Sequence, residues 1–249
     1  MRLSKLAVKS NLLKVVIGIV ALLAVSCESP SKVWLHRAND IAKARYYQNQ
    51  YSGLEVDVHF VDSLNTFIVK HGFSEVSDTR LEDWFASIEQ RSRLGFWIDF
   101  KNLDEHNAEA SAKELARIRD AYRLNGMIIV ESSNARCLKA FDDLRFRTSY
   151  YIPFAIPYEL NQEKLQKLPD SIGNNIERYG LKTISGYWFQ YQFMKDSFPE
   201  MRKLIWYELY DTAVRNQYIN LANEDKNTDV ILVAVEDTID YARELLSNQ

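Results

Sequence analysis

The sequence predicts an α/β fold in which eight parallel strands close into a barrel, and three observations support this expectation. Short apolar stretches alternate with longer polar or amphipathic stretches between residues 33 and 246, as in a chain of β-α units. The 223 residues that follow the first 26 suit one barrel domain better than two domains. Polar residues also stand where the expected strands end. An open, doubly wound sheet is the alternative, but no GxGxxG or Walker-type glycine loop follows any expected strand.

The strands are expected where apolar residues are continuous or alternate with polar ones. Residues 54–60 show the alternation most clearly, because Leu54, Val56, Val58 and Phe60 are separated by polar residues. We expect the eight barrel strands at residues 33–36, 53–61, 95–100, 126–131, 148–152, 181–188, 204–209 and 229–236.

The helices are expected between these strands. Leu81, Trp84, Phe85 and Ile88 have the spacing of one helical face, which predicts a helix over residues 81–91. A short extended piece is expected at residues 67–71. We expect the remaining helices at residues 41–50, 108–124, 135–144, 162–178, 214–222 and 238–246.

Residues 1–26 are expected to be an export signal. Four basic residues precede an apolar segment of eleven residues, which is too short to span a bilayer comfortably. The segment ends in Ala24-Val25-Ser26-Cys27, which resembles a bacterial lipoprotein signal whose cysteine is lipidated; an ordinary secretory signal and an uncleaved anchor are alternatives. We expect residues 27–32 to be a tether and residues 33–249 the barrel. The resemblance implies a lipid-anchored protein of the bacterial cell envelope, and Glu28 after the cysteine favours the outer membrane.

The charge and the cysteines narrow the function classes. Removal of four of the 31 basic residues leaves 27 against 34 acidic ones, a net charge of −7 with neutral histidines. Such an acidic chain is not expected to bind nucleic acid. Cys137 is the only cysteine besides Cys27, so a lipidated Cys27 leaves no disulfide and stability must come from a hydrophobic core.

The stretch from Gly53 to Phe60 has a second, polar face. Glu55, Asp57 and His59 point to this face at intervals of about 7 Å. Stacked carboxylates are costly to bury unless a cation or a proton is shared between them. The alternative is a strand whose polar face is simply in water.

In a parallel barrel the carboxyl ends of the strands form the active-site end. Charged residues fall at or near the ends of the first four expected strands. They are, in chain order, His36, Glu55, Asp57, Asp99, Lys101 and Glu131. Structural charges are more often found on the outer faces of helices, so this placement indicates a site.

The ordered motifs of this region resemble those of glycerophosphodiester phosphodiesterases, which are barrel enzymes related to phosphatidylinositol-specific phospholipase C. The motifs are His36-Arg37, Glu55-x-Asp57, His71 and Asp99-x-Lys101. Further residues resemble the menorin-like branch of the same superfamily: Trp34-Leu35-His36-Arg37-Ala38-Asn39, Leu81-Glu82-Asp83-Trp84 and Trp97-Ile98-Asp99-Phe100-Lys101. The resemblance extends over residues 33–103. It implies hydrolysis of a small phosphodiester or a lipid head group.

The chemistry of that reaction gives the three carboxylates a role. Attack on an anionic phosphodiester requires charge neutralisation, and Mg²⁺ or Ca²⁺ prefers oxygen ligands. Glu55, Asp57 and Asp99 are therefore the expected cation ligands.

The basic residues have complementary roles. Arg37 and Lys101 are expected to hold the phosphate oxygens. His36 and His71 are expected to share the acid and base work, because imidazole titrates near neutrality. The resembled phosphodiesterases imply a neighbouring substrate hydroxyl as nucleophile and a cyclic phosphate that water opens.

Two other function classes remain open. One is a catalytically inactive barrel that serves as a binding module. The other is a carbohydrate-active barrel with paired carboxylates such as Glu131 and Glu208, although it leaves His36, Arg37 and Lys101 without a function. Glu131 is a possible residue of either site.

Overall fold

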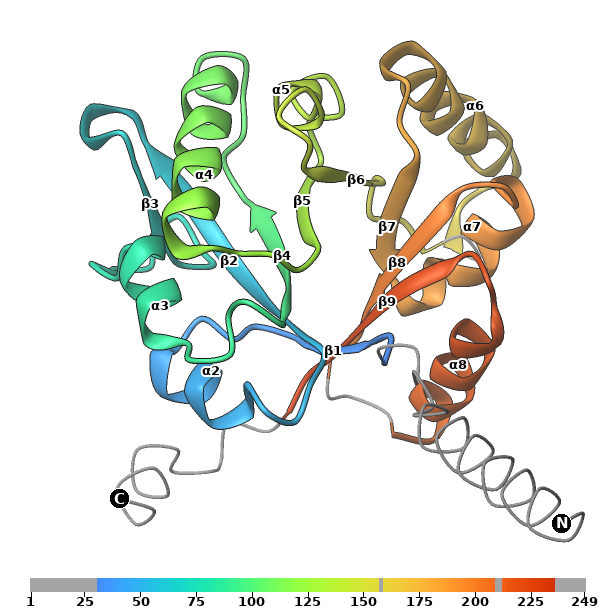
Figure 1. Cartoon of the computed structure of the whole chain (residues 1–249). Helices are drawn as coiled ribbons and strands as arrows, with labels where there is room; N and C mark the ends of the chain where they lie inside the picture. Colours follow the sequence, from blue (N-terminus) through green and yellow to red (C-terminus); the bar gives the residue numbers. More distant parts are fainter. Residues whose placement is uncertain (1–30, 157–158, 209–211, 236–249) are drawn as a thin grey trace, which may run out of the picture. The chain divides into compact units, whose positions relative to one another are not determined.

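The computed structural model describes residues 31–156, 159–208 and 212–235. Eight parallel strands close into a barrel with helices between them (Figure 1). The strand order is β1-β9-β8-β7-β6-β5-β4-β2, and β1 also pairs with β2 to complete the ring. The predicted barrel is confirmed, and the open doubly wound sheet is excluded.

All eight expected strands are present; β2 and β4 have the expected bounds, and the ends of the other six are shifted. Their bounds are Val33–Leu35 (β1), Gly53–Val61 (β2), Gly95–Phe100 (β4), Ile128–Ser132 (β5), Arg147–Tyr151 (β6), Thr183–Tyr187 (β7), Arg202–Trp206 (β8) and Thr228–Val233 (β9). The expected extended piece is a ninth strand, β3 (Thr66–Val69), which runs antiparallel to β2. Strand β3 pairs with the last residues of β2. Strand β1 pairs with Leu54, near the start of β2, so both strands use the same edge of β2.

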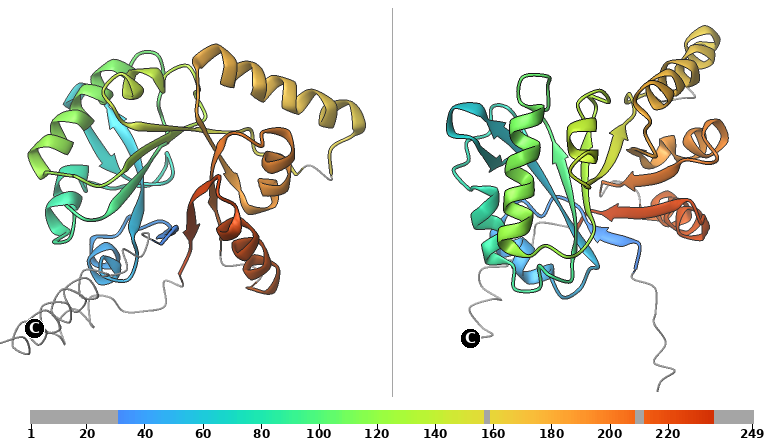
Figure 2. Two further views of the ribbon diagram at one scale, coloured as in Figure 1. Left: turned by 45° about the vertical axis from the view of Figure 1, so that its right-hand side comes forward. Right: turned by 45° about the horizontal axis from the view of Figure 1, so that its top comes forward.

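The helices lie on the outer side of the barrel (Figure 2). Their bounds are Ile41–Tyr47 (α2), Leu81–Ser87 (α3), Ala108–Tyr122 (α4), Lys139–Asp142 (α5), Gln162–Tyr179 (α6), Tyr191–Ser197 (α7) and Thr212–Glu224 (α8). Short 3₁₀ turns add Asp62–Leu64 (η1) and Trp188–Gln190 (η3). Helix α5 is shorter than expected and α7 was not expected. The predicted signal, Cys27 and the predicted helix over residues 238–246 lie outside the described residues.

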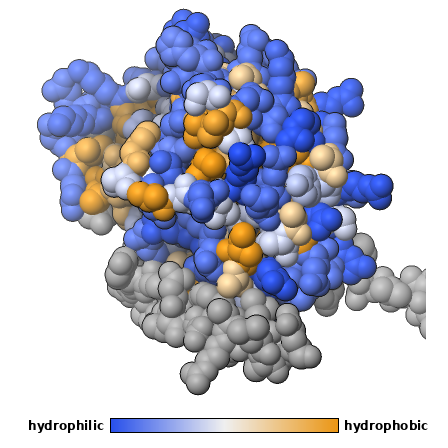
Figure 3. Space-filling view, turned by 90° about the vertical axis from the view of Figure 1, so that its left-hand side faces the viewer, coloured by the Kyte–Doolittle hydropathy of each residue, from blue (hydrophilic) through white to orange (hydrophobic). Residues whose placement is uncertain are grey.

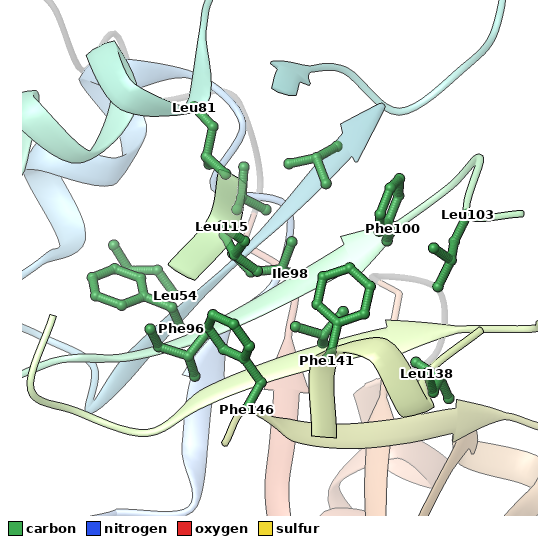
Figure 4. Close-up of a cluster of buried hydrophobic side chains, with 14 of the residues drawn as sticks. Leu54, Leu81, Phe96, Ile98, Phe100, Leu103, Leu115, Leu138, Phe141 and Phe146 are labelled. Atoms are coloured by element: carbon green, nitrogen blue, oxygen red, sulfur yellow. The ribbon is translucent and has the colours of Figure 1, made fainter. Parts of the chain in front are cut away.

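The hydrophobic core has an outer layer between the sheet and the helices. Side chains of β2 and β4 such as Leu54 and Ile98 meet Leu81 of α3, Leu115 of α4 and Phe141 of α5 (Figure 4). All five are completely buried. This layer uses the outward-facing apolar residues of the strands, so the inward-facing residues are left to fill the lumen.

The lumen of the barrel has its own apolar cluster. Its members are Trp34, Trp97, Ile129, Leu204, Val230 and Leu232. Two glycines make room for the indole of Trp34, because a Cβ atom at Gly53 or Gly95 would lie 2.2 Å from a carbon of that ring. Trp34 thereby closes the amino-terminal end of the lumen.

The face of the molecule shown in Figure 3 is mostly hydrophilic, with apolar side chains scattered among polar ones. The large exposed apolar residues around β3 are Leu64, Phe73 and Val76. Within the described residues, no helix is both long enough and apolar enough to cross a bilayer.

The packing of Trp34 against glycine gives a stability prediction. We expect Gly95→Ala to lower the free energy of unfolding by about 1–3 kcal/mol, because the added methyl group overpacks the lumen. The free energies from urea unfolding of Gly95→Ala, Trp34→Leu and the double variant measure this. The two losses should be less than additive, because the smaller side chain at residue 34 removes the clash.

Gly72→Ala is the matched control, since the nearest atom to its added Cβ is 4.0 Å away. It should leave the free energy of unfolding within about 0.5 kcal/mol of the original value. Fully additive losses at residues 34 and 95 would contradict the packing argument.

Candidate functional site

The predicted site residues meet in a cavity of about 280 Å³ at the carboxyl ends of the strands. Seven of the eight line it, namely His36, Arg37, Glu55, His71, Asp99, Lys101 and Glu131. The eighth, Asp57, is 1% exposed and contacts Lys101 and His71. Residues separated by almost one hundred positions in the sequence are therefore neighbours.

Strand register brings the carboxylates together. Asp57 of β2 is in register with Asp99 of β4, which is in register with Glu131 of β5. Glu55 lies one inward-facing position below Asp57 on the same strand. Three carboxylate oxygens, one each from Glu55, Asp57 and Asp99, lie within 4.8 Å of one another. One cation can contact all three at this separation.

Lys101 partly neutralises the negative charge of these carboxylates. Its Nζ lies 2.7 Å from Asp57 Oδ1 and also contacts Asp99 Oδ2. Burial lowers the pKa of Lys101, but Asp99 and Asp57 outweigh it and keep this pKa above its usual range. Burial raises the pKa of Asp57 too, yet hydrogen bonds with His71 and Lys101 hold it well below its usual range. Asp57 and Lys101 therefore form a charged pair.

Glu55 lacks a full set of hydrogen-bond partners among the described residues. Its Oε2 accepts a hydrogen bond from the backbone N–H of Arg37, whereas its Oε1 is buried and has no partner. Burial, and then Asp57 and Asp99, raise the pKa of Glu55 well above its usual range. A bound proton or cation reduces both the cost of burying the Glu55 charge and its repulsion with Asp57 and Asp99. The unpaired oxygen and the oxygen-only donor set fit Mg²⁺ or Ca²⁺.

Asn39 orients Asp57, a role that the sequence analysis missed. Asn39 Nδ2 donates to Asp57 Oδ2 at 2.7 Å, and the Asp57 backbone N–H donates to Asn39 Oδ1 at 2.9 Å. This double contact fixes both the strand and the carboxylate. Asn39 follows the His36-Arg37 motif, but only the position of the β1–α2 loop beside β2 reveals the contact.

The two histidines have different environments. His36 Nδ1 donates to the backbone carbonyl of Tyr207 at 2.9 Å, so its Nε2 is the free nitrogen of the neutral ring and lies 3.9 Å from Glu55. Burial, with help from Arg37, lowers the pKa of His36 to about 4. His71 is half exposed, and its Nδ1 lies 3.2 Å from Asp57 Oδ1. His36 is thus a neutral imidazole whose Nε2 carries no proton, and His71 is a solvent-accessible group beside a carboxylate.

Arg37 stands at the rim with a backbone φ of +51°. Its guanidinium lies 3.2 Å from Glu208 Oε1. Glu208 is thus paired with the Arg37 guanidinium at the rim, whereas Glu131 lies deep in the lumen. This arrangement does not favour the carbohydrate-active alternative, in which the two carboxylates work as a pair.

The other side of the cavity is mostly aromatic and apolar. Tyr151, Trp206 and Leu232 line it, and Trp97 lines the cavity from β4, in register with Glu55. These four were not predicted as site residues, because each one resembles an ordinary core residue. The strand pattern alone does not say which aromatic side chains reach the cavity.

A larger depression of about 630 Å³ lies along α4. Two of its carboxylates are already paired, since Arg117 contacts Glu114 and Lys113 lies 3.6 Å from Glu109. This depression is a solvated helix surface and a poorer candidate for a site than the barrel cavity.

Solved structures with the same fold include phosphodiesterases. A glycerophosphodiester phosphodiesterase from Parabacteroides distasonis has a TM-score of 0.57 at 15% identity, over 88% of this chain and 98% of that one. An Oleispira antarctica phosphodiesterase with the product sn-glycerol-3-phosphate has a TM-score of 0.58 at 14% identity, over 88% and 96%. A calcium-dependent phosphoinositol-specific phospholipase C from a Pseudomonas species has a TM-score of 0.53 at 11% identity, over 84% and 91%.

No protein-family model matches the sequence, and a search of curated proteins finds no match. At the identities of the solved structures the likeness concerns the fold. The chain therefore shares the barrel fold of these phosphodiesterases over nearly their whole length.

The carboxylate cluster gives a metal-binding prediction. We expect Mg²⁺ or Ca²⁺ to raise the melting temperature, with a stabilisation of about 2.7 kcal/mol at a hundredfold excess over the dissociation constant. A chelator should reverse the shift. Asp57→Asn should lose the cation-dependent shift in differential scanning calorimetry.

Glu109→Gln removes an exposed carboxylate on α4 and should keep the full shift. If the unmodified protein shows neither heat of binding nor a melting shift with either cation, the cluster is not a metal site.

Proposed function

We propose that this protein hydrolyses a small phosphodiester with the help of a divalent cation. The convergence of three carboxylates, a lysine and two histidines at one end of the barrel supports this function. The shared fold with known phosphodiesterases adds support.

Glu55, Asp57 and Asp99 would hold the cation, which in such sites neutralises phosphate charge and lowers the barrier to attack on phosphorus. Asn39 keeps Asp57 in place through its two hydrogen bonds. The calcium dependence of the Pseudomonas phospholipase makes Ca²⁺ the first cation to test, with Mg²⁺ beside it.

The cationic side chains bind the substrate phosphate in this proposal. Lys101 lies beside the carboxylates and can reach a phosphate oxygen next to the cation ligands. Arg37 stands at the rim, where its guanidinium can form two parallel hydrogen bonds to a phosphate. Both residues line the same cavity.

The histidines move the protons. His36 is neutral and its Nδ1–H is fixed by the Tyr207 carbonyl, so Nε2 can accept the proton of the attacking hydroxyl. His71 is accessible to solvent and can donate a proton to the leaving alcohol. A neighbouring hydroxyl of the substrate would attack first, and water would then open the cyclic phosphate.

The size of the cavity favours a small substrate. A volume of about 280 Å³ is at or below the lower end of ligand pockets, which span about 300–1,000 Å³. A phosphate and a short alcohol suit this space better than an acylated lipid. The sn-glycerol-3-phosphate bound by the Oleispira enzyme makes glycerophosphodiesters the first compounds to test.

The activity test uses His36→Ala. We expect this variant to lose about 10²–10⁴-fold in kcat/KM for a phosphodiester, because general acid-base catalysis contributes this much. It should keep most of the cation-dependent melting shift. A chromogenic phosphodiester assay with Ca²⁺ or Mg²⁺ measures the first effect and calorimetry the second.

His106→Ala, which changes an exposed loop histidine, should keep full activity. Absence of hydrolysis of glycerophosphodiesters and chromogenic phosphodiesters by the unmodified protein with both cations would favour the inactive binding module.

We further propose that lipidation of Cys27 anchors the protein in the bacterial envelope. The basic segment, the short apolar segment and the small residues before Cys27 support this location.

Cys27→Ser tests the anchor. We expect the variant to move from the membrane fraction to the soluble fraction and to lose the mass of the lipid in mass spectrometry. Unchanged fractionation and unchanged mass would contradict lipidation.

A further inference from the structure

Beside the carboxylate cluster, the cavity contains two buried polar groups that the proposed reaction does not use. Glu131 is 2% exposed and Trp97 is 1% exposed, and both line the cavity. Glu131 Oε2 and Trp97 Nε1 have no hydrogen-bond partner among the described residues, and the Ser185 hydroxyl, which lies close enough to Glu131 to act against the rise of its pKa, has none either. Buried polar groups without partners are uncommon and destabilising, so each one calls for a ligand or a water molecule.

Strand register makes these groups neighbours. Trp97 of β4 is in register with Ile129 of β5, and Glu131 is the next inward-facing residue of β5. Such diagonal pairs on one face of a sheet are close enough for long side chains to reach a common partner. Tyr151 of β6 lies nearby, because Glu131 is in register with Ser149 and Tyr151 is the next inward-facing residue of β6. Burial and then the Glu131 carboxylate raise the pKa of its phenol.

The chemistry of the two groups defines what can bind between them. The Trp97 N–H is only a donor and requires an acceptor. Glu131 Oε2 accepts a hydrogen bond when the carboxyl is ionised or when its proton is on the other oxygen. A hydroxyl group accepts and donates at the same time, whereas an ammonium group only donates and a quaternary ammonium does neither.

We propose that Trp97 and Glu131 form a subsite for a free hydroxyl group on the alcohol of the phosphodiester. The inference rests on the proposed function, because the cation and the basic side chains must hold the phosphate for the alcohol to reach Trp97 and Glu131, which are in register with Glu55 and Asp99. Trp206 and Leu232 supply the apolar wall against the carbon atoms. The substrate class is then a short polyol phosphodiester, with one hydroxyl beyond the one that attacks phosphorus.

A pair of phosphomonoesters tests the subsite by binding, independently of catalysis. The probes are sn-glycerol 3-phosphate and propane-1,2-diol 1-phosphate of the same configuration at C2, which lacks only the terminal hydroxyl. We expect the unmodified protein with Ca²⁺ to bind the glycerol compound about tenfold more tightly in isothermal titration calorimetry, as two hydrogen bonds to one hydroxyl imply.

The variants identify the residues. Glu131→Leu and Trp97→Phe should each bring the ratio of the two dissociation constants near one. Glu131→Gln should preserve most of the ratio, because its amide carbonyl still accepts a hydrogen bond. Trp206→Phe is the matched control for Trp97→Phe and should preserve the ratio, since Trp206 contributes only an apolar surface to the subsite.

Several results would overturn the subsite. They are equal affinities for the two probes, no binding of either probe, or a ratio that Glu131→Leu and Trp97→Phe leave unchanged. Tighter binding of phosphoethanolamine than of sn-glycerol 3-phosphate would assign Glu131 to a cation and also overturn it.

The subsite and the catalytic function can be refuted independently of each other. A tenfold ratio without phosphodiester hydrolysis would keep the subsite and refute the catalytic function. Hydrolysis with a ratio of one would keep the catalytic function and refute the subsite.

Discussion

The contact of Lys101 with Asp57 and Asp99 is the interaction on which the upper part of the barrel depends. Parallel register places the buried carboxylate of Asp57 on β2 beside the partly buried carboxylate of Asp99 on β4. Without a nearby cation these carboxylates would take up protons, because burial and repulsion both favour the neutral form. Lys101, the first residue after β4 and two residues beyond Asp99, supplies that charge. The compensating charge therefore lies next to Asp99 in the sequence.

The lower part of the barrel follows a different rule. Trp34 occupies space that Gly53 and Gly95 leave open, and apolar residues of the lumen pack above it. This dry packing closes one end of the lumen, so polar side chains are confined to the other end. Strand β2 contributes to both ends of the lumen, because its alternate residues Gly53, Glu55 and Asp57 all face inward.

The barrel and the charged residues of the cavity could be predicted because they follow from two regular features of strands. Alternation along β2 separates Glu55 and Asp57 from the apolar outer face, and parallel strands align their carboxyl ends. The aromatic side was not predicted, because Trp97 and Tyr151 have the composition of a core. The role of Asn39 depends on a loop position, and α7 directly follows a 3₁₀ turn whose first residue, Trp188, was expected to end the preceding strand.

The balance of charge explains why one lysine does not complete the site. Glu55, Asp57 and Asp99 would carry three negative charges when ionised, and Lys101 compensates one of them. Two remain, which is the charge that a divalent cation neutralises, and the unpaired Oε1 of Glu55 is where the compensation is missing. An anionic phosphate would otherwise enter a negative cavity. Cation binding and phosphate binding are therefore expected to be coupled, because the first removes the repulsion that opposes the second.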